Sequence, residues 1–156
     1  MAVKQKVMIV DDDTSIAELI SLYLRKECFD TLCVEDGEEA LRQFTEYGPN
    51  LILLDLMLPG MDGYEVCEKI KENPDTEDIP IIFISAYDEP EDVVKGFSVG
   101  GSDYVTKPFI PEVVRSRVSM HLKLHEDNLS MQELNRRLQV SVEEQRRQIE
   151  RERRRV

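Results

Sequence analysis

Acidic, hydroxyl and basic side chains stand at the ends of short apolar runs in this sequence. Asp11 and Asp12 directly follow KVMIV, and Asp55 follows LILL in the stretch NLILLDLMLPGMDG. Ser85 closes the run IPIIFIS, and Lys107 comes just after DYVT. A carboxylate beside so much hydrocarbon is costly unless it is paired, neutralised or bound to a cation. These positions are therefore the first candidates for chemistry.

Phosphoryl transfer is a chemistry that uses all of these groups. Three neighbouring carboxylates resist full ionisation without a cation, and Mg²⁺ favours one or two carboxylates together with water and phosphate oxygens. With Asp11 and Asp12 on the metal, Asp55 is free to act as a nucleophile and form an acyl phosphate. Mg²⁺ and Lys107 can neutralise the phosphoryl oxygens, and Ser85 can donate a hydrogen bond to them.

Each aspartate taken alone also has a purely structural interpretation. Asp13 is well placed to cap a helix that begins near Ser15, and Asp55 precedes Pro59-Gly60 and could belong to a turn. What favours a functional site is the combination, because a reactive group stands at the end of each of four predicted strands.

The elements that must position these groups alternate five times along the chain. Short runs rich in Val, Ile and Leu predict strands buried on both faces, and amphipathic segments between them predict helices on both sides of a parallel sheet. The predicted strands are 6–10, 31–34, 51–54, 79–85 and 103–106, with helices at 15–26, 38–45, 63–71 and 89–99 and after Pro111. Right-handed crossovers then favour an α/β, flavodoxin-like, doubly wound five-stranded sheet of order 2-1-3-4-5. In this class, ligands bind beyond the carboxyl ends of the strands.

The last predicted helix continues well beyond this domain, because no Pro or Gly occurs between Val113 and Val156. Eight positions in its second half follow a 4-3 heptad spacing, and five of them are apolar, which predicts an extended helix with a coiled-coil seam. The seam comprises Met131, Asn135, Leu138, Val142, Gln145, Ile149, Glu152 and Val156. We therefore expect a compact domain over 1–124 and a helical coiled-coil linker over 125–156. Because the chain ends inside an Arg-rich helix, we expect the linker to lead to an output domain that this chain does not contain.

Charge and composition narrow the classes of partner. The net charge of the chain is −12, and residues 1–124 carry all of it, with 12 basic against 25 acidic side chains. We expect so acidic a domain not to bind nucleic acid directly. The sequence has no apolar run long enough to insert into a membrane and no signal peptide, so we expect a soluble, cytoplasmic protein. The three cysteines lack metal-binding spacing and are expected to be free and mostly buried.

The motifs MIVDDD, LILLDLMLPGMDG, FISA and DYVTKPF resemble the receiver domain of bacterial response regulators, over about residues 3–124. The resemblance implies that Asp55 is the phosphoacceptor. It implies that Mg²⁺ is bound by Asp11, Asp12, Asp55 and the backbone carbonyl of Met57.

The same resemblance assigns the remaining groups of the site. Ser85 would be the switch hydroxyl, Lys107 the lysine that pairs with the phosphate, and Tyr104 the aromatic switch whose rotamer follows phosphorylation. The Lys107–Pro108 bond resembles the family's cis peptide, a state that only an X-Pro bond adopts at low cost.

The implied function is two-component signalling, with a sensor histidine kinase or a phosphotransfer protein as phosphoryl donor. The protein would not be an enzyme beyond its own phosphorylation and autodephosphorylation at Asp55. It would switch the face formed by the fourth helix, fifth strand and fifth helix, and form homodimers through that face and the coiled coil. The output could be a diguanylate cyclase, although the sequence does not choose among output domains.

Two other functions compete with this interpretation. A phosphohydrolase of the haloacid-dehalogenase type also uses an aspartate nucleophile, but its DxDx[TV] motif requires a second aspartate where this chain has Met57. A dimerisation or scaffold module independent of phosphorylation would form stable helical dimers without Mg²⁺ or phosphate. The i, i+4 pair His121 and His125 has the spacing of a zinc site, but no third ligand is evident.

Overall fold

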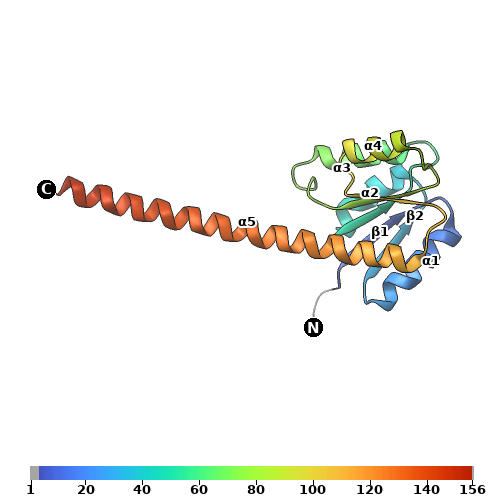
Figure 1. Ribbon diagram of the computed structural model, residues 1–156, viewed down its shortest axis with the longest axis horizontal. Helices are drawn as coiled ribbons and strands as arrows, with labels where there is room; N and C mark the ends of the chain where they lie inside the picture. The colour runs from blue at the N-terminus through green and yellow to red at the C-terminus, as the bar shows by residue number, and fades with distance from the viewer. Residues whose placement is uncertain (1–3, 156) are drawn as a thin grey trace. The chain divides into compact units, whose positions relative to one another are not determined.

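The computed structural model describes residues 4–155 and divides into two compact units, one up to Leu122 and one from Lys123 onward. The first unit is a parallel sheet of order β2-β1-β3-β4-β5 with helices on both faces (Figure 1), which confirms the predicted α/β fold and strand order. The strands are β1 (Lys6–Val10), β2 (Asp30–Val34), β3 (Leu51–Leu54), β4 (Ile81–Ser85) and β5 (Asp103–Thr106). The helices are α1 (Thr14–Lys26), α2 (Gly37–Tyr47), α3 (Gly63–Glu72), α4 (Pro90–Ser98) and α5 (Pro111–Arg154).

The central strands are the most apolar because both of their faces are covered. Every residue of β3 and β4 is buried, and so is β1 after its first residue. The edge strands β2 and β5 are only partly buried and carry more polar residues. In the register of the sheet, Val10 of β1 pairs with Val34 of β2 and with Leu54 of β3, so these three strands end level with one another.

Two apolar clusters, one on each face, hold the helices to the sheet. On one face, α1 and the start of α5 pack against Val7, Ile9 and Ile82. On the other face, α2 and α3 pack against Met8 and Phe83. At roughly 25 cal/mol per Å² of apolar surface removed from water, such burial is the main favourable contribution to folding.

Capping residues fix where the helices begin. Asp13 accepts hydrogen bonds from the amides of Ser15 and Ile16, which confirms its predicted capping role. Asp36 and Asp62 cap α2 and α3 in the same way, as expected for aspartate at an N-cap. Helix α5 begins at Pro111, where the missing N–H is tolerated.

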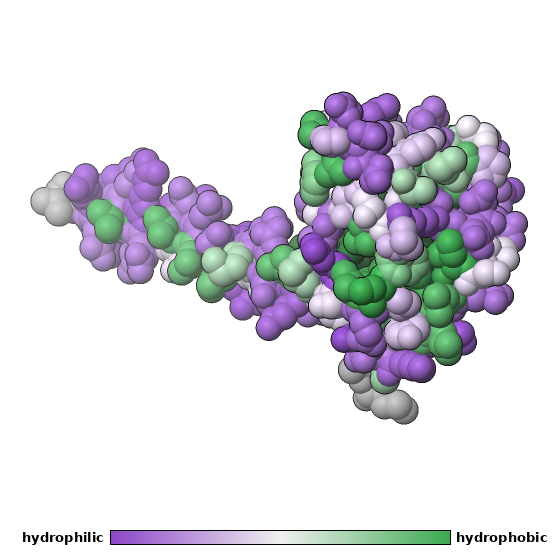
Figure 2. Space-filling view, turned by 45° about the vertical axis from the view of Figure 1, so that its right-hand side comes forward, coloured by the Kyte–Doolittle hydropathy of each residue, from purple (hydrophilic) through white to green (hydrophobic). Residues whose placement is uncertain are grey.

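Helix α5 runs without interruption from Pro111 to Arg154, as predicted. Val114, Val118 and Leu122 bury their side chains in the first unit. In the second unit the apolar side chains of the heptad seam are about half exposed, and Figure 2 shows apolar residues among charged ones along this helix. Val156, the last seam position, lies outside the described residues. Pairing of this helix with another stays a prediction.

Two further expectations can be compared with the structure. All three cysteines are free, but only Cys67 is buried, so the expectation of mostly buried thiols is wrong for Cys28 and Cys33. Cys28 follows α1 with a φ of 67°, and Cys33 lies on the edge strand β2. Within residues 4–155, no helix is long and apolar enough to cross a membrane.

Candidate functional site

Adjacent strands β1 and β3 bring the aspartates to one edge of the sheet. The amide of Asp11 donates to the carbonyl of Val34 at 3.1 Å, and that of Asp55 donates to the carbonyl of Val10 at 2.9 Å. Each aspartate thus extends the strand ladder by one residue and then leaves the sheet. Asp11, Asp12 and Asp55 each offer a carboxylate oxygen, and these atoms all lie within 4.8 Å of one another.

Lys107 connects the two buried carboxylates. Its Nζ donates to Oδ2 of Asp11 at 3.1 Å and to Oδ2 of Asp55 at 2.9 Å. The Oδ1 atoms accept from amides two residues ahead, those of Asp13 at 2.9 Å and Met57 at 3.1 Å. The side chains of both aspartates are only 4% exposed, and that of Lys107 is 18% exposed. Each carboxylate is therefore fixed by one backbone donor and the shared ammonium.

The charges of this cluster influence one another. Burial raises the pKa of Asp11, and the charge of Asp55 adds to this, while hydrogen bonds from the Asp13 amide and from Lys107 oppose it. Burial alone would lower the pKa of Lys107, but its hydrogen bonds to Asp55 and Asp11 raise the pKa above its ordinary value. Lys107 is therefore charged at neutral pH. Lys107 contacts two of the three clustered carboxylates, and a single ammonium leaves negative charge and oxygen ligands that suit a hard divalent cation.

Ser85 is the last residue of β4, and Tyr104 lies within β5, where it pairs with Phe83 of β4. Ser85 is fully buried, its Oγ accepts from the amide of Tyr87 at 3.2 Å, and its carbonyl accepts from the amide of Lys107 at 2.8 Å. The hydroxyl of Tyr104 donates to the carbonyl of Tyr87 at 2.6 Å. Burial raises the pKa of Tyr104 to about 12, so it is a hydrogen-bond donor at neutral pH.

The structure thus gathers Asp11, Asp12, Asp55 and Lys107 in direct contact or close approach. The Lys107–Pro108 bond is cis, as predicted. The part expected of the Met57 carbonyl in metal binding stays a prediction, because the contact shown by the structure is from its amide. The roles of all these groups in catalysis and switching stay predictions as well.

Sequence reasoning missed one residue that the site requires. A Cβ on Gly63 would lie 2.3 Å from the carbonyl oxygen of Asp55 and 2.9 Å from Cα of Leu56. Helix α3 can therefore start this close to the site only with glycine at that position. The Asp62-Gly63 pair, a cap followed by a residue without a side chain, was the available signal.

The i, i+4 spacing of His121 and His125 suggested a shared metal ion, but in the structure His121 contacts Asp103. Its Nε2 lies 3.0 Å from Oδ2 of Asp103, which also accepts from Arg117 at 3.0 Å, and the other oxygen accepts from the amide of Tyr104. This partly buried network ties α5 to β5. It supports the structural interpretation of His121 over a zinc site.

Comparison with known proteins agrees with this geometry. Residues 7–119 match the family model of the response regulator receiver domain. The chain is 43% identical over 124 residues to the DNA-binding response regulator MtrA of Mycolicibacterium smegmatis, covering 80% of this chain and 53% of MtrA. The chain therefore spans about half the length of the curated relatives it matches.

Solved structures give the same result. The BeF₃-activated receiver domain of DrrB, from Thermotoga maritima, is 36% identical, with a TM-score of 0.71 over 78% of this chain and 99% of that one. A CheY-like receiver domain protein from Methanospirillum hungatei is 26% identical, with a TM-score of 0.76 over 81% of this chain and 99% of the other. With its fold, its acidic edge and most of its length matched, this chain belongs to the response regulator receiver domain family.

Proposed function

We propose that this receiver accepts a phosphoryl group on Asp55 from a phosphohistidine of a sensor histidine kinase or a phosphotransfer protein. The observation that carries the proposal is the bridge from Lys107 to Asp11 and Asp55. A structural aspartate needs no such arrangement, whereas a nucleophile with an adjacent cation and acidic neighbours suits phosphoryl transfer.

In this reaction, an oxygen of Asp55 attacks phosphorus, and the bond from phosphorus to the donor's imidazole nitrogen breaks. The Oδ1 atom is held by the Met57 amide, which leaves Oδ2, now on Lys107, as the candidate nucleophile. After the transfer, the ammonium of Lys107 pairs with the negatively charged phosphoryl oxygens. Hydrolysis of the acyl phosphate returns Asp55, so the turnover is autodephosphorylation rather than catalysis on a separate substrate.

Asp11, Asp12 and Asp55 fit a magnesium ion, because their oxygens lie within 4.8 Å of one another at an edge that is partly open through exposed Asp12. The Met57 carbonyl completes the proposed ligand set. When bound, Mg²⁺ would neutralise negative charge on the phosphoryl oxygens.

Switching follows from the added charge. A phosphoryl group brings roughly two negative charges and new acceptor oxygens, which draw the Ser85 hydroxyl toward Asp55. The space that Ser85 leaves lets Tyr104 turn, and the face of α4, β5 and α5 changes. Phosphorylation need only bias two states already in equilibrium.

Intact-mass measurement tests the acceptor. Incubation with Mg²⁺ and acetyl phosphate, or with a phosphohistidine donor, is expected to add one phosphoryl group to the wild type and none to Asp55→Asn. Chelation of Mg²⁺ should abolish the adduct. An equal adduct on Asp55→Asn, or none on a folded wild type with either donor, would refute the assignment.

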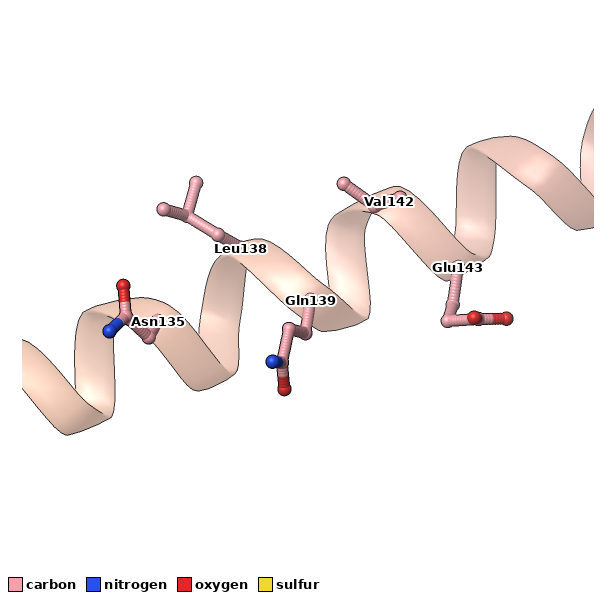
Figure 3. Close-up of a pocket in the computed structure, with 5 residues that line it drawn as sticks. All are labelled: Asn135, Leu138, Gln139, Val142 and Glu143. Carbon is pink, nitrogen blue, oxygen red and sulfur yellow. The ribbon is translucent and has the colours of Figure 1, made fainter.

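The second unit supports dimerisation as part of the same proposal. Leu138 and Val142 project to the same side of α5 and, with Asn135, Gln139 and Glu143, line a shallow hollow on the helix surface (Figure 3). In coiled coils such a hollow between successive seam residues receives a side chain of the partner helix. We therefore propose a homodimer through this seam and the α4–β5–α5 face.

Analytical ultracentrifugation tests the seam. Leu138→Glu, on the seam, should weaken the dimer at least tenfold, since it places a charge in an apolar layer. Val140→Glu is the matched control, because Val140 is as exposed as Leu138 but stands outside the heptad positions. Equal effects of the two substitutions would argue against the seam.

Location and output complete the proposal. The three free thiols suit a reducing compartment, and we place the protein in the cytoplasm. MtrA is a DNA-binding response regulator, but α5 here continues as a polar helix with a heptad seam. We propose that it signals to an output domain, such as a diguanylate cyclase, through that helix.

A further inference from the structure

Helix α4 has few apolar anchors. Of its residues, all of which the structure describes, Gly96 is the buried one, whereas α1, α2 and α3 each bury three to five. Val94 and Phe97 are 67% and 49% exposed, and Glu89 at the N-cap makes no side-chain capping bond within the described region. The position of α4 must therefore depend on other contacts.

Two side chains of α3 supply such contacts, one at each end of α4. The hydroxyl of Tyr64 donates to the carbonyl of Asp92 at 3.0 Å, in the first turn. The thiol of Cys67 donates to the carbonyl of Val99 at 3.4 Å, at the C-cap. The ammonium of Lys95 also lies 4.4 Å from the centre of the Tyr64 ring, a cation–π contact. Tyr64 thus makes two of the contacts that hold α4.

Tyr64 is also connected to the predicted switch residue. Its ring lies 5.8 Å from that of Phe83, and Phe83 lies 6.1 Å from Tyr104. The hydroxyl of Tyr104 donates to the carbonyl of Tyr87. The segment from 87 to 92 is therefore held at one end by a tyrosine of β5 and at the other by a tyrosine of α3.

We infer that Tyr64 is a positioning residue of the switch, whose hydroxyl keeps the first turn of α4 docked until Asp55 is phosphorylated. The inference rests on the proposed function, because the segment 87–92 follows Ser85 directly and must move when Ser85 is drawn toward a phosphoryl group. That movement breaks the bond from Tyr64 to Asp92. The hydroxyl of Tyr64 thus sets part of the cost of switching.

Hydrogen exchange of the full chain, with and without acetyl phosphate and Mg²⁺, tests the inference. Tyr64→Phe removes the hydroxyl and keeps the ring. In the unphosphorylated protein we expect α4 amides to exchange about fivefold faster in this variant, the effect of one lost net hydrogen bond on local opening, with β1 and β3 unchanged. Tyr47→Phe is the control, since that hydroxyl contacts Asp30 of β2 instead.

Phosphorylation separates a switch role from a merely structural one. Once Asp55 is phosphorylated, the difference between wild type and Tyr64→Phe should shrink below about twofold, because the bond is then already broken. Equal α4 exchange of the two unphosphorylated proteins would overturn the inference, and so would a fivefold difference that persists after phosphorylation. Failure of the wild type to form any adduct would instead refute the proposed function, while exchange of the unphosphorylated proteins still decides whether Tyr64 anchors α4.

Discussion

Replacing Lys107 by methionine removes the ammonium that bridges Asp11 and Asp55 and keeps most of the aliphatic stem. The carboxylate oxygens lie within 4.8 Å of one another, and two unit charges at that distance repel by about 3.5 kcal/mol at an effective dielectric constant of 20. Removing one partner of a buried ionic cluster commonly costs about 3–5 kcal/mol. Since Asp12 is exposed and water reaches this edge, we expect Lys107→Met to lower the free energy of unfolding by about 2–4 kcal/mol at pH 7.

Urea unfolding followed by circular dichroism, in EDTA at pH 7, measures this loss in two backgrounds. In the Asp55→Asn background the repulsion is gone, so the loss on removing Lys107 should fall to less than half. The difference between the two losses is the coupling energy of the pair. Added Mg²⁺ should stabilise Lys107→Met more than the wild type, because ligand binding to the folded state adds stability.

The result that would refute this reasoning is an equal loss in both backgrounds. Lys107 would then stabilise the fold through its stem or through its contact with Asp11 alone. The bridge between the two carboxylates could no longer carry the argument for the site.

Two other perturbations test parts of the fold that support the site. Burial alone would raise the pKa of Asp103, but hydrogen bonds from the Tyr104 amide, His121 and Arg117 together lower it. The ionised carboxylate therefore contributes stability above about pH 3.8, and this stability is lost as the pH falls. Asp103→Asn should therefore cost about 1–3 kcal/mol at pH 6, with a difference from wild type that closes below pH 4 in urea titrations; a difference independent of pH would contradict the assignment. Gly63→Ala should cost about 2–3 kcal/mol or more, because its Cβ meets backbone atoms, whereas Glu68→Ala, exposed on the same helix, should cost less than about 0.5 kcal/mol by the same assay.

Much of the site could be predicted because it depends on topology more than on side-chain detail. Parallel strands of order 2-1-3-4-5 end at one edge, so any residue that follows a strand is placed near the others there. Asp11 and Asp55 follow adjacent strands that end level, and their meeting needs no further information. The predicted strand bounds were close to the observed ones. The exception is β4, which was predicted from residue 79 but begins at Ile81, because Pro80 has no N–H to donate to the ladder.

Contacts made by individual side chains could not be predicted in this way. Tyr64 and Asp92 are 28 residues apart, and His121 and Asp103 are 18 apart, so neither pair lies within one element where periodicity applies. Hydrophobic patterning places a tyrosine or histidine on a helix face but not the atom that its polar end reaches. The exposure of Cys33 is different, because the predicted strand order already placed its strand at the edge of the sheet, where the expectation of a buried thiol should have been revised.

The acidic edge also shows why stability and function oppose each other in this fold. The raised pKa of Asp11 means that the folded protein disfavours the ionised carboxylate, so its charge costs stability at neutral pH. The same charge, together with the nearby carboxylates of Asp12 and Asp55, would favour a divalent cation at this edge. Substituting an amide at Asp11 should therefore stabilise the isolated domain while it weakens metal binding. A buried carboxylate that is unfavourable for the fold, yet placed among neighbours that suit one reaction, is better explained by that reaction than by any contribution to stability.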